Sequence, residues 1–275
     1  MERLSYAYDC ASLRRDILTF CDANPEWCCT IIGRSRQGRP IWALRRGCGG
    51  VLIHAAHHAN EWITSAVLMR WMLRMPPKAD AVIVPMVNPD GVELVMGCDT
   101  LWARSMAGNV PFPSGWKANA AGVDLNLNYP AGWRQAVELK RHMGVDGPAA
   151  RDWPGPYPLS EPETRTMVRL NEEGFCRSLS LHSQGGEIYW QYNGIKPEGA
   201  LALAEKMAAA SGYAIAAPPE TASHAGFKDW FLLRYRRPAY TVEMGRGENP
   251  LPLEDFGSLC EEMFPLLNVF CMADD

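Results

Sequence analysis

Two side chains that could bind a metal ion stand three residues apart, between an apolar stretch and a predicted helix. The stretch Val51-Leu52-Ile53 is typical of a short buried strand, and His58 and Glu61 follow it, with His57 as a rival to His58. Apolar residues at three- and four-residue spacing after Glu61 predict a helix with Asn60 as its N-cap. Ligands of open α/β sheets bind at the carboxyl ends of strands, so an imidazole and a carboxylate there could share one zinc ion.

The spacing His-x-x-Glu is weak evidence on its own, because short patterns recur by chance. Two further apolar strands strengthen it, since one ends in His182 and the other carries Glu243 at its end. A lone histidine at a strand end is usually structural, but a carboxylate in an apolar strand is costly to bury unless it is paired or functional. His58, Glu61 and His182 therefore make a candidate zinc set, and Glu243 is left as general base for metal-assisted hydrolysis.

Strands and helices alternate along the chain. We expect helices over residues 5–23, 197–211 and 253–272, one that follows Glu61 and ends before Pro76, and one that begins at Ser160–Glu163. We expect strands over 30–33, 40–44, 51–54, 81–87, 178–183 and 239–245. Asn88–Gly91 has the composition of a turn, and Ser160 that of an N-cap with Glu163 completing a capping box. The alternation predicts one α/β catalytic domain, residues 1–275, with a mixed sheet and helices on both faces. The N-terminal helix and hairpin, residues 1–48, would pack onto this domain.

The composition excludes several classes of partner. The chain has 275 residues, 47% of them hydrophobic, a net charge of −4 and only a short basic cluster at Arg234, Arg236 and Arg237, so no nucleic-acid partner is expected. There is no apolar run of about 18 residues that would predict a membrane span. Nine cysteines without a C-x-x-C pair, and no apolar signal core at the N-terminus, predict reduced thiols and a cytoplasmic protein.

The chain resembles the zinc carboxypeptidase family (the M14 metallopeptidases) over roughly residues 30–250. The resemblance is carried by six motifs in the family's order: His58–Thr64, Asn88–Gly91, Gly122–Asn126, Ser160–Glu163, His182-Ser183 and Thr241–Glu243. It implies a sheet of about eight strands, one Zn²⁺ on His58, Glu61 and His182, and Glu243 as the base.

The sequence departs from the carboxypeptidase branch at two places. Leu127 follows Asn126 where that branch has an arginine for the terminal carboxylate of the substrate, and leucine cannot replace a bidentate arginine. The arginine expected to polarise the scissile carbonyl is also missing, which leaves Lys117 as a candidate in its place. Residues 124–130 and 243–250 instead resemble a bacterial branch that cleaves γ-D-glutamyl–meso-diaminopimelate bonds in peptidoglycan peptides.

The resemblance therefore predicts a zinc peptidase acting on peptidoglycan-derived peptides (muropeptides). Candidate substrate contacts are Asn126, Lys117, Arg151, Lys228 and Arg246. One alternative is a conventional metallocarboxypeptidase or deglutamylase that uses a relocated arginine. Another is a zinc-free binding module on the same fold, against which the presence of all four chemical residues argues.

Overall fold

The computed structural model describes residues 4, 7–97 and 101–272 of the chain, and it contains one eight-stranded mixed sheet. The strands lie in the order β1-β2-β4-β3-β5-β8-β6-β7. Their bounds are Cys28–Arg34 (β1), Pro40–Arg46 (β2), Val51–Ala55 (β3), Ala81–Val84 (β4), Arg177–His182 (β5), Glu187–Tyr189 (β6), Ala214–Ile215 (β7) and Ala239–Glu243 (β8). The four central strands β4, β3, β5 and β8 run parallel, so their carboxyl ends meet at one edge.

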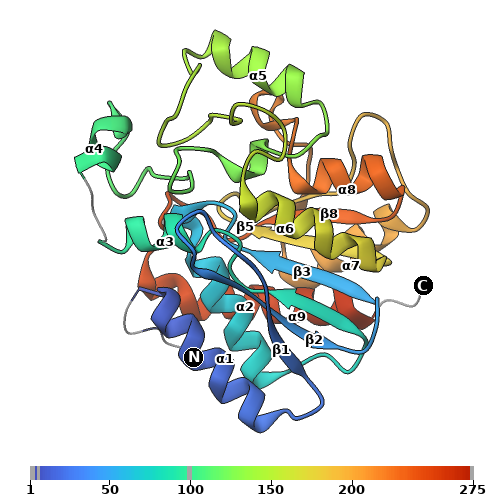
Figure 1. The fold of residues 1–275 in the computed structure, drawn as a ribbon. Helices are drawn as coiled ribbons and strands as arrows, with labels where there is room; N and C mark the ends of the chain where they lie inside the picture. The colour runs from blue at the N-terminus through green and yellow to red at the C-terminus, as the bar shows by residue number, and fades with distance from the viewer. Residues whose placement is uncertain (1–3, 5–6, 98–100, 273–275) are drawn as a thin grey trace.

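Helices cover both faces of this sheet, as the sequence predicted (Figure 1). Their bounds are Cys10–Ala23 (α1), Ile63–Arg74 (α2), Pro89–Val95 (α3), Leu101–Ala107 (α4), Trp133–His142 (α5), Pro162–Leu170 (α6), Ala200–Ser211 (α7), Phe227–Tyr235 (α8) and Phe256–Met272 (α9). Helices α1, α2, α7 and α9 share one apolar core, and α6 and α8 contribute to a second. In β3, Val51 and Ile53 belong to the first core and Leu52 to the second, which is the alternation that a strand covered on both faces requires.

The N-terminal segment packs against the rest of the sheet. β1 and β2 form the expected antiparallel hairpin, and β2 also pairs with β4. Helix α1 begins at Cys10, later than the predicted start at residue 5, and residues 5–6 lie outside the described part. That residues 1–275 form a single catalytic domain stays a prediction.

Local expectations were wrong at three places, two of them N-caps and one a turn. Asn60 lies inside a short 3-10 helix, Ala59–Glu61, and its amide donates to the Ser114 carbonyl instead of capping α2. Asn88 is the N-cap of α3 and accepts from the Gly91 N–H, so Asn88–Gly91 begins a helix where a turn was predicted. The N-cap of α6 is Glu161, without a side-chain capping bond, so Ser160 lies one residue before the cap and its hydroxyl donates to the Glu161 carboxylate.

The cysteine prediction was wrong at one pair. Cys21, near the end of α1, is disulfide-bonded to Cys29 at the start of β1, and their Cα atoms are 6.7 Å apart. The other described cysteines are free thiols. Separately, none of the helices that the structure describes is both long and apolar enough to cross a membrane.

Candidate active site

The carboxyl ends of three adjacent parallel strands bring the predicted chemical residues together. His182 is the last residue of β5 and Glu243 the last residue of β8, and the two are paired in register. His58 and Glu61 follow β3, which lies on the other side of β5. Residues up to 185 positions apart in sequence therefore meet at one edge because their strands are parallel neighbours.

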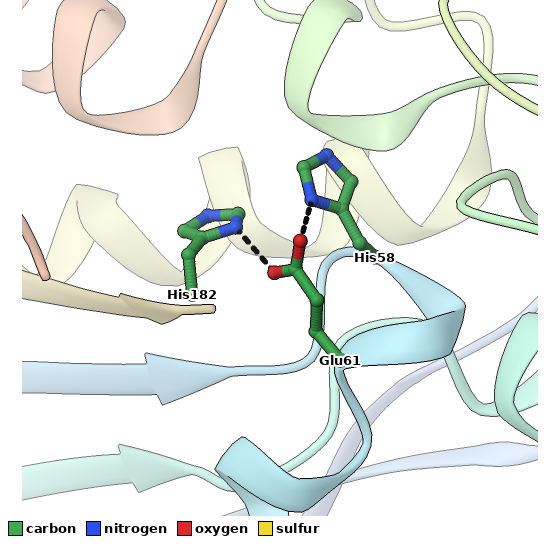
Figure 2. Close-up of side chains that lie close together, drawn as sticks. All are labelled: His58, Glu61 and His182. Carbon is green, nitrogen blue, oxygen red and sulfur yellow. Dashed lines mark hydrogen bonds and ion pairs between the residues drawn. The ribbon is translucent and has the colours of Figure 1, made fainter. Parts of the chain in front are cut away.

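His58, Glu61 and His182 form the described cluster whose donor atoms suit a metal ion (Figure 2). His58 Nδ1 lies 2.8 Å from Glu61 Oε1, and His182 Nδ1 lies 2.9 Å from Glu61 Oε2. All three ligand atoms lie within 4.8 Å of one another. Two imidazole nitrogens and one carboxylate are the donor set of a catalytic zinc with an open fourth position, so these residues fit zinc.

The rival histidine has another partner. His57 Nε2 lies 2.9 Å from the Tyr129 hydroxyl, and its ring stacks on that of His182 with the centroids 5.8 Å apart. His57 is fully buried and is not part of the cluster. Its ring packs behind the cluster and does not supply a donor to it.

Charged neighbours keep Glu61 ionised inside the protein. Burial would raise the pKa of Glu61, but His58 and Lys117 hold that pKa well below its usual value. Lys117 Nζ lies 3.3 Å from Glu61 Oε1. The cluster therefore presents a carboxylate, which is the form that a metal ion binds.

Asp124 is a member of this site that the sequence analysis did not assign. Its Oδ1 lies 3.1 Å from His58 Nε2, on the far side of the ring from Glu61. A carboxylate there accepts the Nε2 proton of His58, and Nδ1 would then be the nitrogen that binds a metal ion held together with Glu61. Asp124 belongs to the motif Gly122–Asn126, which the sequence analysis had identified. The neighbouring residues of Asp124 do not indicate that it contacts a histidine 66 residues away.

Glu243 stands beside the cluster on the wall of a cleft. Its side chain is only partly buried, and the described part of the chain provides it with no hydrogen-bond donor. Burial raises the pKa of Glu243. A carboxylate whose pKa is raised toward neutrality is a better proton acceptor and donor near neutral pH.

The cleft has a volume of about 500 Å³ and contains most of the predicted substrate contacts. Asn126, Lys117, Arg151 and Lys228 all line it, together with His58 and Glu243. Asn126 Oδ1 accepts the N–H of Phe227 at the start of α8. Leu127, the residue in place of the family's arginine, is buried and is not among the described residues that line the cleft.

Arg246 differs from the other candidates. It is exposed, its guanidinium lies 5.9 Å from the centre of the Tyr213 ring, and it is not among the described residues that line the cleft. Arg151 does line the cleft, and its Nε donates to Asp152 at 2.9 Å. The structure therefore brings four of the five predicted substrate contacts to the cleft and leaves Arg246 outside.

Comparison with known proteins shows the family of the chain. Residues 17–266 match the zinc carboxypeptidase family. The chain is 37% identical to the uncharacterized protein YqgT of Bacillus subtilis, over 92% of this chain and 74% of that protein. It is also 37% identical to gamma-D-glutamyl-L-diamino acid endopeptidase 1 of Lysinibacillus sphaericus, over 93% of this chain and 70% of that protein.

Two solved structures share the fold. Bovine thrombin-activatable fibrinolysis inhibitor matches with a TM-score of 0.77 at 20% identity, covering 97% of this chain and 96% of that one. Murein-tripeptide amidase MpaA from Escherichia coli O157 matches with a TM-score of 0.61 at 21% identity, covering 90% and 93%. The fold, the convergent donor set and the family match lead to one conclusion: the chain belongs to the zinc carboxypeptidase family and is a metallopeptidase.

Proposed function

We propose that this chain hydrolyses the amide bond between a γ-D-glutamyl residue and meso-diaminopimelate in peptidoglycan-derived peptides. In this proposal His58, Glu61 and His182 hold one Zn²⁺. The single observation that carries the proposal is the cluster of their donor atoms, within 4.8 Å of one another, at the edge of the cleft that Glu243 lines.

The side chains have separate roles in the hydrolysis. A zinc ion held by the cluster supplies Lewis acidity to the scissile carbonyl and to the attacking water. Glu243 takes the proton of that water and returns it to the leaving amine, for which its raised pKa is suited. Lys117, whose ammonium is directed to Glu61, supplies positive charge beside the carbonyl oxygen.

The substrate class rests on a departure from the family and on a relative. Leu127 replaces the arginine that binds a terminal carboxylate in the carboxypeptidase branch. The two parallel hydrogen bonds that such an arginine donates to the carboxylate of an ordinary C-terminal residue are therefore missing. The relative from Lysinibacillus sphaericus is named for cleavage at a γ-D-glutamyl–diamino acid bond. The rival function is a conventional carboxypeptidase or deglutamylase in which Arg151, which lines the cleft, serves as the relocated arginine.

A comparison of two substrate sets tests the proposal. Zinc-loaded protein is incubated with the tripeptide L-Ala-γ-D-Glu-meso-diaminopimelate and with ordinary peptides, whose C-terminal residue is joined through an α-peptide bond, and the products are identified by mass. We expect free meso-diaminopimelate from the tripeptide and slow release from the ordinary peptides. Efficient release of C-terminal residues without turnover of the tripeptide would reject this substrate and favour the rival function.

The cytoplasmic location also stays a proposal. The Cys21–Cys29 disulfide weakens the argument that cysteine usage made for a reducing compartment. Cell fractionation with an antibody against the chain would decide between the cytoplasm and another compartment.

A further inference from the structure

Helix α5 buries a lysine, although most of its other side chains reach solvent. The helix lies apart from the central sheet (Figure 1), and its two buried residues are Ala136 and Lys140. The side chain of Lys140 is only 5% exposed. Lysine is rarely buried unless its ammonium has a partner, so the position of Lys140 depends on what it contacts.

The partner of Lys140 is Asp152, in the loop that follows α5. Lys140 Nζ donates to Asp152 Oδ1 at 2.6 Å. The backbone of Asp152 has a φ of 70°, in the left-handed region that residues with a side chain rarely adopt. Such a conformation persists only where the surrounding structure holds it. The ammonium of Lys140 is one of the contacts that hold Asp152 in place.

Asp152 makes two further contacts, one toward each part of the active site. Its Oδ2 accepts the Nε–H of Arg151 at 2.9 Å, and Arg151 lines the cleft. Its backbone N–H donates to Asp124 Oδ2 at 3.3 Å, and the other oxygen of Asp124 lies 3.1 Å from His58 Nε2. Asp152 therefore connects Lys140 to a cation of the cleft and to the carboxylate behind His58.

The residues on either side of this short stretch of loop also contact the site. The Ala150 carbonyl accepts the N–H of Lys117 at 2.8 Å. The Trp153 carbonyl accepts the N–H of Asp124, also at 2.8 Å. Because the backbone before and after Asp152 is bonded to residues of the site, a displacement of Asp152 would move those residues as well.

Stability alone does not account for the buried charge of Lys140. Removing an ion pair from water is costly, and apolar side chains of similar volume are often at least as stabilising. An apolar residue at position 140 would continue the buried face of α5 that Ala136 begins. An ion pair with a short hydrogen bond differs from an apolar contact in one respect, because it fixes the orientation of its partner.

We propose that Lys140 is a positioning residue of the active site. Its contact with Asp152 keeps the Asp152 N–H directed to Asp124, which orients the ring of His58 for zinc. The same contact keeps the Asp152 carboxylate on Arg151 and thereby keeps the Arg151 guanidinium at the cleft. The first effect concerns zinc binding, and the second rests on the proposed function because it concerns the substrate.

The zinc affinity of a Lys140 variant tests the first effect. Lys140→Met keeps the approximate length of the side chain and removes its charge. We expect it to lower the zinc affinity, measured by competition with a chelator, by roughly 10-fold, the lower end of the range for residues behind a metal ligand. Arg141→Met removes a positive charge from the exposed side of the same helix and is the matched control, which should keep the wild-type affinity.

A double-mutant cycle shows whether Lys140 acts through Asp152. Asp152→Asn removes the charge of the partner, and asparagine tolerates the left-handed backbone. Asp152→Asn should lower the zinc affinity about as much as Lys140→Met does, and the double variant should lose no more than either single variant. Losses that multiply in the double variant would mean that the two residues act independently, and would overturn the inference.

Steady-state kinetics with the tripeptide L-Ala-γ-D-Glu-meso-diaminopimelate at saturating zinc test the second effect. We expect Lys140→Met to raise KM by about 2- to 5-fold, a small change because the Arg151 side chain is 42% exposed. kcat should stay within about twofold of wild type, because Arg151 would contact the substrate away from the reacting atoms. An unchanged KM would overturn the role of Lys140 in placing Arg151.

The outcomes separate this inference from the proposed function. A folded Lys140→Met variant with zinc affinity within about twofold of wild type would overturn the inference and leave the function standing. A wild type that binds zinc but does not hydrolyse the tripeptide would reject the function, and the chelator competition would still decide the role of Lys140. A wild type that binds no zinc would overturn both.

A second variant covers the case in which Lys140→Met does not fold, as judged by circular dichroism. The double variant Lys140→Met with Asp152→Asn neutralises both members of the pair and leaves no buried charge without a partner. It should show the same loss of zinc affinity, roughly 10-fold. Wild-type zinc affinity in this double variant, once shown to be folded, would overturn the inference.

Discussion

The contact between Asp124 and His58 gives a sharp test of the proposed zinc site. Asp124 Oδ1 lies 3.1 Å from His58 Nε2, while His58 Nδ1 faces Glu61 at 2.8 Å. Removing such a carboxylate behind a ligating histidine typically lowers metal affinity by roughly 10- to 100-fold, or about 1.4–2.8 kcal/mol. We expect Asp124→Asn to lower the zinc affinity by about 10-fold, because its amide oxygen can still accept the Nε2 proton. Asp124→Ala has no such acceptor and should lower the zinc affinity by about 100-fold.

The assay is competition for zinc with a chelator of known affinity, read as a dissociation constant. Asp124 also accepts the N–H groups of Asn126 at 3.2 Å and Asp152 at 3.3 Å, so each variant's thermal unfolding is measured as well. Asp146→Asn, the same change on an exposed loop residue, is the control. Zinc affinity of a folded Asp124→Ala variant within twofold of wild type would refute the reasoning, provided that His58→Ala loses zinc.

Three further predictions follow from other parts of the structure. Glu243→Gln should keep zinc, measured by elemental analysis, but lose roughly 10²- to 10⁴-fold in kcat, and near-wild-type turnover would remove Glu243 from its role. Burial raises the pKa of Glu163 to about 7, so the folded state binds the proton of this carboxyl more tightly than the unfolded state does. The stability that the protonated Glu163 contributes is therefore complete below about pH 4.5 and is lost as pH rises through about 7. The free energy of unfolding of Glu163→Gln, measured in urea, should therefore rise by about 2.5 kcal/mol relative to that of wild type between pH 5 and pH 8, and a pH-independent difference would count against the shift. Cys21 and Cys29 should resist alkylation until reductant is added, and mass spectrometry finding both alkylated in untreated protein would contradict the disulfide.

The sequence alone was sufficient for the fold class and for the set of candidate metal ligands. Apolar strands such as Val51–Ala55 are covered on both faces, so they appear in the sequence as continuous apolar runs and are easily found. Polar residues just after strands that run parallel lie at one edge of the sheet, whichever order those strands take. For this reason His58, Glu61, His182 and Glu243 can be selected from the order of residues along the chain.

Local capping and strand ends were less predictable, because several local signals compete. Asn88 has the chemistry of a turn residue and of an N-cap alike, and the 3-10 helix before α2 moves Asn60 away from the capping position. β4 ends at Val84, before the predicted end at residue 87, because Pro85 cannot donate a ladder hydrogen bond.

Only the tertiary structure decided which distant side chains meet. It placed Asp124 against His58, turned Lys228 and Asp229 into the cleft, left Arg246 on the surface and joined Cys21 to Cys29. The patterns that sequence analysis uses repeat along one strand or helix and depend on neighbours a few residues away. Contacts between loops depend instead on how whole elements pack, and a short motif such as Gly122–Asn126 contains no information about the histidine that its aspartate will meet.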